Sequence, residues 1–577
     1  MADVVFVTPN LAGNIQSEHI GTMLLATILR DHGITPVILQ YFRFGDPGKD
    51  FQRFLDNALS QIQSHSPKIV SFYTRCDTYH ISLMMARCLK ELDPGIYIVF
   101  GGPQSDMSAE DTLSQIDYVD YICRGEGENT VYPFFSSLLA GTPDLSVPGL
   151  VYRKDGKVIM NPRPALCDLS KIPDIDYSFF PLPEICDEKT VFSVDVGRGC
   201  PFGCTFCSTK TFWGRVYRLK DPQQIVQEIR TVHQRFGISN FNFAHDMFTM
   251  KRRQVIETCR LLKELDFPIQ WRCSARLDCI DPELIDIMVD AGMIQLYCGI
   301  ETGSPRMQKL VNKNLKLDRV MDILSYANAK GIQLTTSFIF GFPDETEEDI
   351  SCTISLMGKI AALRNVVIQC HLCTFMYGTE MTERYRDRLT PTDVLSDTTG
   401  GIALAECRDI IEAHPSLFVH FHEYHTELRT ALRFLPQFVL MWTHFQPVFQ
   451  YISEKYPADR LIEMYQDYVG ANEEMLCQIV ETPDMFNHHR LLEKDNFLSS
   501  FSKDENYDKI YDYRRIKLME AGDGLDIGKP VSQIYCISPS QIHSNARLED
   551  YTRGIFAVTH IKNPNGSVSH RIRSMKA

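Results

Sequence analysis

The sequence lacks two features that would place the protein in a membrane or on nucleic acid. No apolar run in its 577 residues approaches the roughly 18 to 20 residues that a membrane-spanning helix requires. Basic residues are in the minority, with 59 Lys and Arg against 73 Asp and Glu, whereas nucleic-acid phosphates require a basic face. The start of the chain, MADVVFVTPN, does not have the pattern of a signal peptide. We therefore expect a cytoplasmic protein with no transmembrane segment and no nucleic-acid partner.

Disulfide and dinucleotide patterns are also missing. Most of the 18 cysteines stand singly in apolar surroundings, which is typical of reduced, buried thiols. Two glycine-containing stretches, Gly101-Gly102-Pro103 and Gly125-Glu126-Gly127, follow apolar runs, but neither matches the GxGxxG fingerprint. A nicotinamide cofactor is therefore not expected.

Residues 1–145 alternate apolar runs with amphipathic stretches. The runs VVFVTP, TPVILQYF, KIVSFY and IYIVFGGP predict strands. Helices are predicted over residues 18–32, 51–64 and 79–92. This alternation indicates an α/β domain with a doubly wound, Rossmann-like parallel sheet, which binds ligands beyond the carboxyl ends of its strands.

Three further regions follow this domain. Residues 146–189 are irregular and rich in Pro and Asp, which indicates a connector. Residues 190–380 hold six strand-like runs separated by helical patterns, which predicts a partial (β/α) barrel of the TIM type. Residues 381–577 predict a mainly helical, aromatic region that ends in a β-hairpin turning at Asn565-Gly566. We expect this last region to select the substrate.

Three cysteines, Cys200, Cys204 and Cys207, follow the first barrel strand in the sequence CPFGCTFC. Packing is a poor explanation, because Pro201 and Gly203 make this segment a loop. A structural zinc site normally closes with four ligands, and no second pair of ligands stands nearby. Thiolates also hold iron–sulfur clusters, and three protein ligands leave one iron of a four-iron cube open. The spacing favours this third interpretation.

The CxxxCxxC spacing, with the aromatic Phe206 before its last cysteine, resembles the signature of radical S-adenosylmethionine (SAM) enzymes. The resemblance covers roughly residues 190–375. It implies a [4Fe-4S] cluster on Cys200, Cys204 and Cys207 whose open iron binds SAM. Reductive cleavage of SAM would then give a 5′-deoxyadenosyl radical, with electrons from a donor such as flavodoxin or ferredoxin.

Residues after the next four strands match positions that bind SAM in this family. Asp246 would lie beside the methionine amino group, and Arg276 and Glu301 would form charge-assisted hydrogen bonds with the cosubstrate. Each residue alone has a surface or helix-cap role as its alternative, but their register after successive strands favours binding. The expected set is Asp246 in FAHDMF, Ser274 and Arg276 in SARLD, Glu301 in GIETGS, and Gly341, Pro343 and Glu345 in IFGFPDE.

The first region resembles the cobalamin-binding domain that precedes the barrel in a large subgroup of these enzymes, by its position and its GGP and RGEGE stretches. The resemblance implies cobalamin near Gly101, Gly102 and Gly125. The motif DxHxxG, which supplies an axial histidine, is absent. We therefore expect no histidine below the cobalt, with His19 and His80 as ordinary helix residues. The alternative is a Rossmann-like scaffold or lid without cofactor.

The predicted function is that of a radical SAM methyltransferase, which uses cobalamin to methylate an unactivated carbon. The main alternative keeps the radical chemistry but performs cyclisation, rearrangement or oxidation. A different class is a non-catalytic metal-binding or redox-sensing protein. In HFHEYH, His420, His422 and His425 offer a metal site, although the alternating aromatics favour a buried segment. The substrate, a small molecule or a peptide, is not legible in the sequence.

Overall fold

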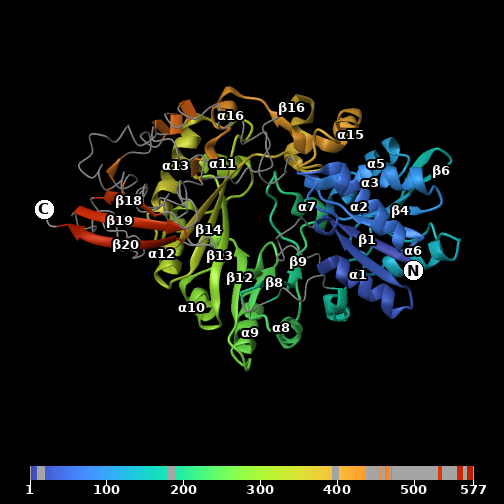
Figure 1. The fold of residues 1–577 in the computed structure, drawn as a ribbon, viewed down its shortest axis with the longest axis horizontal. Coiled ribbons are helices and arrows are strands. Elements are labelled where there is room, and N and C mark those ends of the chain that lie inside the picture. The colour runs from blue at the N-terminus through green and yellow to red at the C-terminus, as the bar shows by residue number, and fades with distance from the viewer. Residues whose placement is uncertain are drawn as a thin grey trace. The chain divides into compact units, whose positions relative to one another are not determined.

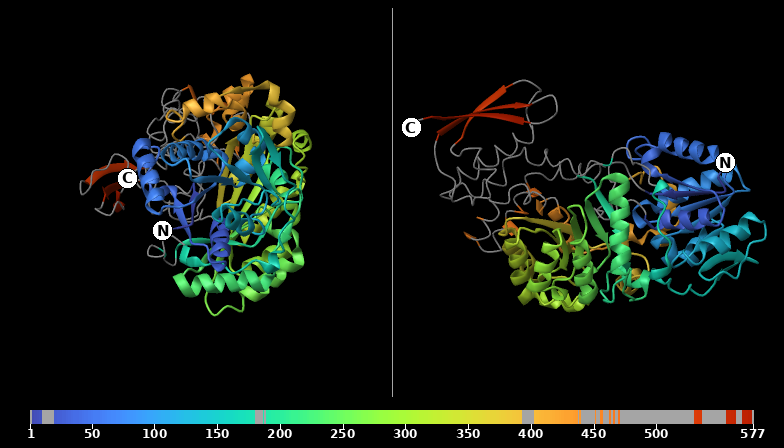
Figure 2. Two further views of the ribbon diagram at one scale, coloured as in Figure 1. Left: turned by 90° about the vertical axis from the view of Figure 1, so that its right-hand side faces the viewer. Right: turned by 90° about the horizontal axis from the view of Figure 1, so that it is seen from below.

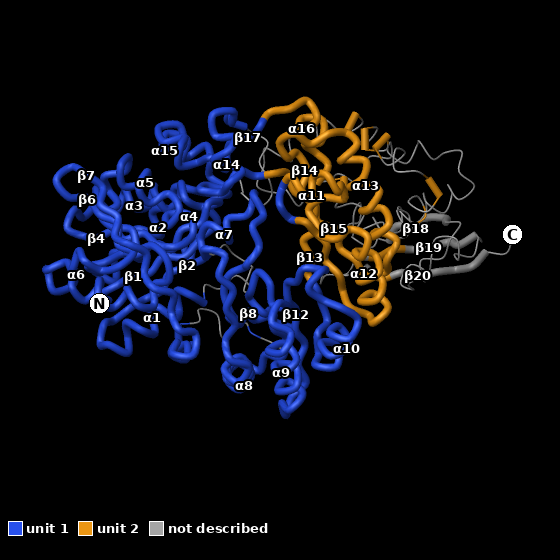
Figure 3. Tube along the Cα trace, turned by 180° about the vertical axis from the view of Figure 1, so that it is seen from behind, with its two compact units in different colours: residues 1–296, 311–313, 374–424 blue, residues 297–310, 314–373, 425–577 orange. Residues whose placement is uncertain are grey.

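The computed structural model describes residues 2–9, 20–179, 186, 189–392, 402–436 and 438–439, short pieces between 451 and 470, and 530–535, 555–562 and 568–575. The chain divides into two compact units, coloured separately in Figure 3. Unit 1 comprises Met1–Leu296, Val311–Lys313 and Thr374–Tyr424, and unit 2 comprises Tyr297–Leu310, Asn314–Cys373 and His425–Ala577.

The N-terminal sheet of unit 1 has seven strands in the order β2-β1-β3-β4-β5-β6-β7 (Figure 1). The first five in this order pair in parallel, and β6 and β7 extend the sheet antiparallel. This order is that of a doubly wound fold, so the predicted Rossmann-like sheet is confirmed. The strands are β1 (Val4–Thr8), β2 (Pro36–Gln40), β3 (Ile69–Tyr73), β4 (Tyr97–Gly101), β5 (Tyr121–Cys123), β6 (Leu150–Lys154) and β7 (Lys157–Met160).

Helices cover both faces of this sheet, because each helix buries an apolar stripe. Leu24 and Phe134 belong to the core on one face, and Phe54 and Met85 to the core on the other. The helices are α1 (Ile20–Asp31) and α6 (Val131–Leu139) on the first face, and α2 (Phe51–Ser64), α3 (Tyr79–Leu92) and α5 (Ala109–Gln115) on the second. The bounds of α2 and α3 are those predicted from the sequence.

A segment that follows the barrel in sequence belongs to the same N-terminal core. Residues 402–421, with α15 (Arg408–Ala413), pack against the face that carries α3. Arg87 forms an ion pair with Asp409 at 2.8 Å, and a ring nitrogen of His80 lies 2.8 Å from the carbonyl oxygen of Ile402. Part of the region after residue 380 is therefore built into unit 1.

The second large sheet has six strands in the order β15-β14-β13-β12-β11-β8, which confirms the predicted partial barrel (Figure 1). Its strands account for the six predicted runs, and α8 (Pro222–Phe236) lies between β8 and β11 in the sequence. The strands are β8 (Val191–Asp195), β11 (Asn240–Ala244), β12 (Gln270–Ala275), β13 (Met293–Glu301), β14 (Gln333–Phe340) and β15 (Val366–Leu372). Its other helices include α9 (Arg252–Leu262), α10 (Pro282–Asp290), α11 (Pro305–Leu310), α12 (Val320–Ala329) and α13 (Glu347–Ala361).

The C-terminal strands form a three-stranded antiparallel sheet, drawn in red in Figure 2. It consists of β18 (Pro530–Tyr535), β19 (Ile555–Lys562) and β20 (Val568–Met575). The predicted hairpin corresponds to β19 and β20, whereas its turn at Asn565-Gly566 lies outside the described residues. Among the described residues, no helix has both the length and the apolar character needed to cross a bilayer.

One buried carboxylate joins the N-terminal sheet to the barrel within unit 1. Glu126, directly after β5, is 5% exposed and accepts hydrogen bonds from Arg198 (3.0 Å) and Arg218 (3.2 Å). These arginines lie on β9 (Gly197–Arg198) and β10 (Arg218–Leu219), an antiparallel pair that flanks the cysteine loop. Glu126 also accepts a 2.6 Å hydrogen bond from the backbone of Cys167 in the connector. A single side chain thus holds three parts of unit 1 together.

We expect Glu126→Gln to destabilise the fold by about 3–5 kcal/mol at pH 7, because Arg218 loses its buried carboxylate partner and Arg198 keeps only Glu128 and Asp195. Burial raises the pKa of Glu126, but hydrogen bonds from Arg218 and Cys167 outweigh burial and hold it at about 2, below the ordinary 4.5. Because the pKa is lowered in the folded state, this stabilisation is complete above pH 4.5 and is lost as pH falls towards 2. Urea unfolding at pH 7 and pH 3 measures both effects.

The difference between wild type and Glu126→Gln should therefore shrink at pH 3. Glu257→Gln is the control, because this exposed residue pairs with Arg260 on the surface of α9 and its loss should leave stability unchanged. Equal stability of wild type and Glu126→Gln at pH 7 would contradict the assigned role of the carboxylate.

Candidate functional site

A cavity of about 810 Å³ lies in unit 1 at the carboxyl ends of strands from both sheets. Its volume is near the upper end of the range of about 300–1,000 Å³ that is common for ligand pockets. Gly101, Gly102 and Gly125 line it after the N-terminal strands, and Asp246 and Ser274 line it after the barrel strands. Five of the predicted cofactor-binding residues therefore share one cavity.

The N-terminal side of the cavity depends on a close backbone approach at Gly102. This residue has φ +92, and a Cβ there would lie 2.8 Å from backbone atoms of Thr74. Only glycine adopts this conformation in this space without strain. The chain thus turns sharply from β4 into α4 (Pro103–Met107), and the strand end is left facing the cavity.

The barrel side of the cavity is polar because side chains alternate along each strand. On β11, Phe241 and Phe243 are buried, whereas Asn242 and Ala244 line the cavity. The same alternation sends Ser193 and Asp195 of β8 into the cavity. Sequence analysis did not single out these polar residues, although the period-2 pattern in NFNFA carried the signal.

Asp246 presents its carboxyl group to this cavity. The residue is accessible from the cavity, yet the surrounding protein raises the pKa of the carboxyl above its ordinary value by burial. Burial raises the pKa of the Cys200 thiol, and Cys207 and Asp246 lie near enough to raise it further. The predicted amine-binding carboxylate is thus a neighbour of the cysteine loop.

The cysteine loop starts and ends in fixed backbone positions. Gly199 has φ +82, and a Cβ there would overlap the carbonyl oxygen of Val216. At the other end, Cys207 precedes α7 (Ser208–Trp213). Cys204 is buried, whereas Cys200 and Cys207 are half-buried.

A short segment of unit 1 holds the middle of this loop. Asn312 donates to the carbonyl oxygen of Gly203 at 2.8 Å, and the backbone N–H of Thr205 donates to Val311 at 2.9 Å. In the described part of the chain, no three His, Cys, Asp or Glu side chains are close enough to share one ion. The cysteines of a four-iron cube bind different irons and do not meet at one ion, and the assignment of Cys200, Cys204 and Cys207 as cluster ligands stays a prediction.

Arg276 supports the same loop. Its guanidinium lies 3.9 Å from the centre of the Phe202 ring and donates to Asp278 and to the carbonyl oxygen of Lys313, both at 2.8 Å. Its Nη1 is buried and has no hydrogen-bond partner in the described residues. A donor buried without a partner is costly, which fits a negatively charged group bound beside the loop.

The other predicted SAM residues belong to unit 2. Glu301 ends β13 with φ +69 and is 8% exposed, and Gly341 and Pro343 follow β14. Glu345 accepts a 2.7 Å hydrogen bond from the N–H of Gly341. Burial raises the pKa of Glu345 to about 8, although hydrogen bonds from backbone amides oppose the shift.

Sequence analysis missed one residue that supports this motif. Arg429, on α16 (Glu427–Ala431), is 4% exposed and donates to the carbonyl oxygens of Gly341 (3.3 Å) and Cys373 (3.0 Å). It therefore joins the ends of β14 and β15. A lone arginine in a region without a readable pattern gave no signal of this contact.

The histidines of HFHEYH do not gather around an ion in the described residues. His420 is 3% exposed and packs against Phe418 and Phe421, which matches the expected buried segment. A ring nitrogen of His422 lies 3.1 Å from the carbonyl oxygen of Phe418. Neither histidine lines the cavity.

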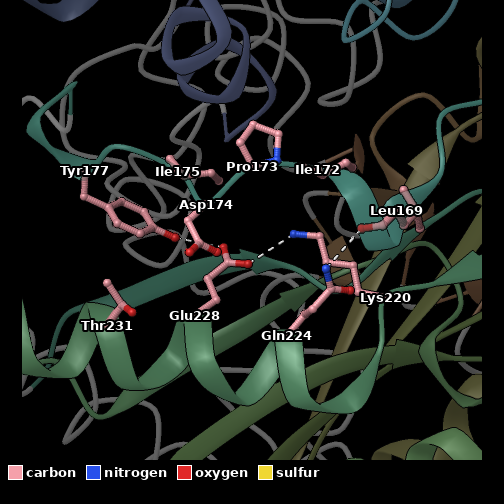
Figure 4. Close-up of a pocket in the computed structure, with 10 residues that line it drawn as sticks. All are labelled: Leu169, Ile172, Pro173, Asp174, Ile175, Tyr177, Lys220, Gln224, Glu228 and Thr231. Carbon is pink, nitrogen blue, oxygen red and sulfur yellow. Dashed lines mark hydrogen bonds and ion pairs between the residues drawn. The ribbon is translucent and has the colours of Figure 1, made fainter. Parts of the chain in front are cut away.

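A second pocket, of about 40 Å³, lies against α8 and has room for only a few waters (Figure 4). Figure 4 shows Lys220 and Tyr177 directed at Glu228. Lys220 Nζ lies 3.1 Å from the Glu228 carboxylate, and the Tyr177 hydroxyl donates to it at 2.8 Å. Because these polar groups satisfy one another, we assign the pocket a structural role.

Two family models match the chain where this geometry lies. The radical SAM superfamily model matches residues 194–357, which contain the cysteine loop. The B12 binding domain model matches residues 15–134, which contain the glycines at the N-terminal strand ends. The chain carries a B12-binding domain and a radical SAM domain. The predicted cofactors, a [4Fe-4S] cluster, SAM and cobalamin, are those that these domains imply.

Several named proteins resemble this chain over more than half of its length. An uncharacterized methyltransferase of Pyrococcus horikoshii is 28% identical over 346 residues, which cover 59% of this chain and 73% of that protein. The anaerobic magnesium-protoporphyrin IX monomethyl ester cyclase of Rubrivivax gelatinosus is 28% identical, and the match covers 61% of this chain and 65% of the cyclase. The cytidylyl-2-hydroxyethylphosphonate methyltransferase of Streptomyces wedmorensis is 26% identical, and the match covers 56% of this chain and 69% of that methyltransferase.

Two solved structures share the fold. The cobalamin-dependent SAM radical enzyme OxsB, with aqua-cobalamin bound, matches with a TM-score of 0.61 at 16% identity, and the match covers 90% of this chain and 80% of OxsB. The radical SAM methyltransferase TsrM from Kitasatospora setae matches with a TM-score of 0.54 at 17% identity, with 67% and 78% covered. At these identities the likeness concerns the fold alone.

We expect anaerobic reconstitution to load about four irons and four sulfides per chain, because the radical SAM domain binds one four-iron cube. Replacement of Cys200, Cys204 and Cys207 together by alanine should abolish the cluster absorption. Cys279→Ala is the matched control, because Cys200 lies near enough to raise the pKa of the Cys279 thiol, yet Cys279 is outside the loop. Iron analysis and absorption spectra measure the outcome. Retention of the same spectrum by the triple variant would disprove the ligand assignment.

Proposed function

We propose that the protein is a cobalamin-dependent radical SAM methyltransferase that adds a methyl group to an unactivated carbon. The observation that carries this proposal is the single cavity that the strand ends of the B12-binding domain share with those of the radical SAM domain. The methyltransferases of Pyrococcus horikoshii and Streptomyces wedmorensis among its relatives support the same reaction class. When bound, the cluster and SAM supply a 5′-deoxyadenosyl radical, and methylcobalamin supplies the methyl group.

A non-methylating reaction is the second candidate, and one observation favours it. A relative of comparable identity, from Rubrivivax gelatinosus, is named as a cyclase. Formation of 5′-deoxyadenosine under reducing conditions would support either enzyme and exclude a redox sensor. A product heavier by one methyl group would then separate methylation from cyclisation.

The chain's own residues would bind and orient the cosubstrate. Asp246 would hold the ammonium group of SAM, since it is accessible in the cavity and lies near Cys200. The free Nη1 of Arg276 would take the carboxylate, and Ser274 would donate a hydrogen bond from the strand end. The proposed roles of Glu301, Gly341 and Pro343 of unit 2 in binding SAM stay predictions from the sequence.

The B12-binding domain would hold cobalamin at Gly101, Gly102 and Gly125 without an axial histidine. His80 is fully buried in α3, bonded to Ile402, and does not line the cavity. His245 lines the cavity, but both of its ring nitrogens have backbone partners. Its Nδ1 accepts a hydrogen bond from the backbone N–H of Met247 at 2.7 Å, and its Nε2 lies 3.3 Å from the backbone carbonyl oxygen of Arg218. His19 lies outside the described residues.

The partners follow from this chemistry. Reduction of the cluster requires a one-electron donor, for which we propose a flavodoxin or ferredoxin in the cytoplasm. The proposed substrate is a small molecule or a peptide. We propose no nucleic-acid partner, because the formal net charge of the chain is -14 and nucleic-acid phosphates require a basic surface.

Asp246→Asn should weaken SAM binding about 10- to 100-fold while the iron content stays unchanged, because a hydrogen bond to a charged group contributes roughly 1.5–3 kcal/mol. Equilibrium dialysis of SAM against the reconstituted protein measures the affinity. Asp290→Asn is the control, because Asp290 ends α10 with a side chain that is 72% exposed. Unaltered affinity in Asp246→Asn would show that the carboxylate does not bind the cosubstrate.

The protein loaded with cobalt(II) cobalamin should show no nitrogen splitting in its electron paramagnetic resonance spectrum, because His245, the one histidine among the described residues that line the cavity, has hydrogen-bond partners at both ring nitrogens. Protein-bound cobalamin is quantified first by absorption. A split signal that disappears in His19→Ala, His80→Ala or His245→Ala would identify an axial ligand and overturn this expectation. Failure to bind cobalamin would favour the non-methylating candidate.

A further inference from the structure

The loop after β3 carries a cationic side chain at the wall of the cavity. Among the described residues that line the cavity and belong to the B12-binding domain, Arg75 is the one with a cationic side chain. Arg198, the other arginine that lines the cavity, lies before the cysteine loop and forms ion pairs with three carboxylates, those of Glu126, Glu128 and Asp195. The B12-binding domain therefore presents one positive charge to a ligand in the cavity.

The backbone fixes Arg75 beside the glycine turn at the end of β4. Tyr73, the last residue of β3, is in register with Gly101. Thr74 donates to the carbonyl oxygen of Gly101 from its backbone N–H at 2.8 Å and from its hydroxyl at 2.9 Å. The same hydroxyl accepts a 3.0 Å hydrogen bond from the backbone N–H of Ser105. The loop that carries Arg75 is thus held to both β4 and α4.

Asp77 holds one edge of the Arg75 guanidinium and leaves the other edge available. Nε (3.1 Å) and Nη2 both donate to the Asp77 carboxylate, which also accepts a 3.3 Å hydrogen bond from the hydroxyl of Thr78. Nη1 has no hydrogen-bond partner in the part of the chain that the structure describes, and the side chain is 38% exposed. Because a guanidinium has more N–H donors than one carboxylate can accept, its outer edge can bind a second anion.

Cobalamin carries a group that matches this cation. The loop that joins its corrin ring to its nucleotide base contains a negatively charged phosphodiester, whereas the amide side chains of the ring are neutral. Bidentate hydrogen bonds from arginine to phosphate are strong because both partners are charged. Gly101 and Gly102, where we place cobalamin, offer only backbone groups, so Arg75 supplies a charge that they lack.

We propose that Arg75 binds the phosphate of the cobalamin nucleotide loop, and that Asp77 orients its guanidinium for this contact. The domain would then select complete cobalamin over corrinoids that lack the phosphate. The inference rests on the proposed function, because it assumes that cobalamin occupies this cavity. It adds the residue that determines which corrinoid is bound.

Equilibrium dialysis of three corrinoids against the reconstituted full chain tests the proposal. The probes are cobalamin, cobinamide phosphate, which keeps the phosphate but lacks the base, and cobinamide, which lacks both. Arg75→Met should weaken the binding of cobalamin and of cobinamide phosphate roughly 10- to 100-fold and leave that of cobinamide unchanged. Arg75→Lys should weaken the first two less, because lysine keeps the charge without the planar fork.

Two controls separate a lost contact from a folding defect. Arg53→Met should bind all three corrinoids as wild type does, because Arg53 lies on the exposed surface of α2 and does not line the cavity. Wild type itself, which needs no substitution, should prefer cobinamide phosphate to cobinamide. Equal affinity of wild type for these two probes, equal loss of all three corrinoids in Arg75→Met, or undiminished cobalamin binding in that variant would overturn the proposal.

This inference and the proposed function fail separately. Equal binding of cobinamide phosphate and cobinamide by a protein that forms 5′-deoxyadenosine would contradict the role of Arg75 alone. A preference for the phosphate that depends on Arg75, in a protein that forms no 5′-deoxyadenosine, would contradict the proposed function alone.

Discussion

The ion pairs of Glu126 with Arg198 and Arg218 are the interaction on which the site depends. Glu126 follows strand β5 of the N-terminal sheet, both arginines lie on the β9–β10 pair beside the cysteine loop, and the connector contributes the backbone of Cys167. Arg198 lies two residues before Cys200, so the position of the cysteine loop is fixed by a side chain of the B12-binding domain. Buried charges are costly unless they are paired with good geometry, and here all the partners must be in place together. The two cofactor-binding domains are therefore coupled through structure as well as through chemistry.

The polar lining of the cavity follows from the pleat of its strands, which directs alternate side chains to opposite faces of the sheet. Along β11, phenylalanines face the helices and asparagines face the interior, so one strand supplies both a packed core and a polar wall. The same alternation on β12 puts Trp271 against β11 and α10 and leaves Ser274 to the cavity. The strands thus line the cavity with polar side chains and keep the apolar layer of the barrel on their other face.

Local patterns predicted the elements of the fold well, because helix and strand periodicity are properties of neighbouring residues. The first four strands of the N-terminal sheet, the six barrel strands, the full span of α2 and the cysteine loop followed from such patterns, whereas β6 and β7 lie within the predicted connector. The contacts of Glu126 span 72 and 92 residues, and Arg429 reaches Gly341 across 88 residues. A single charged residue has no periodic pattern that would indicate its partner far away in the sequence. These contacts therefore could not be predicted from the sequence. Arg276 was read as a ligand residue, and its support of Phe202 became visible only with the fold.

The return of residues 402–421 to the N-terminal core has a consequence for how the chain is made. The bonds of His80 to Ile402 and of Arg87 to Asp409 each join residues 322 positions apart. At a synthesis rate of roughly 5–20 residues per second, about 16–64 s pass between the synthesis of α3 and that of residues 402–421, which cover it. During that interval its apolar side chains are exposed to other nascent chains. The order of synthesis therefore leaves the apolar face of α3 open to association with other chains until residues 402–421 have been made.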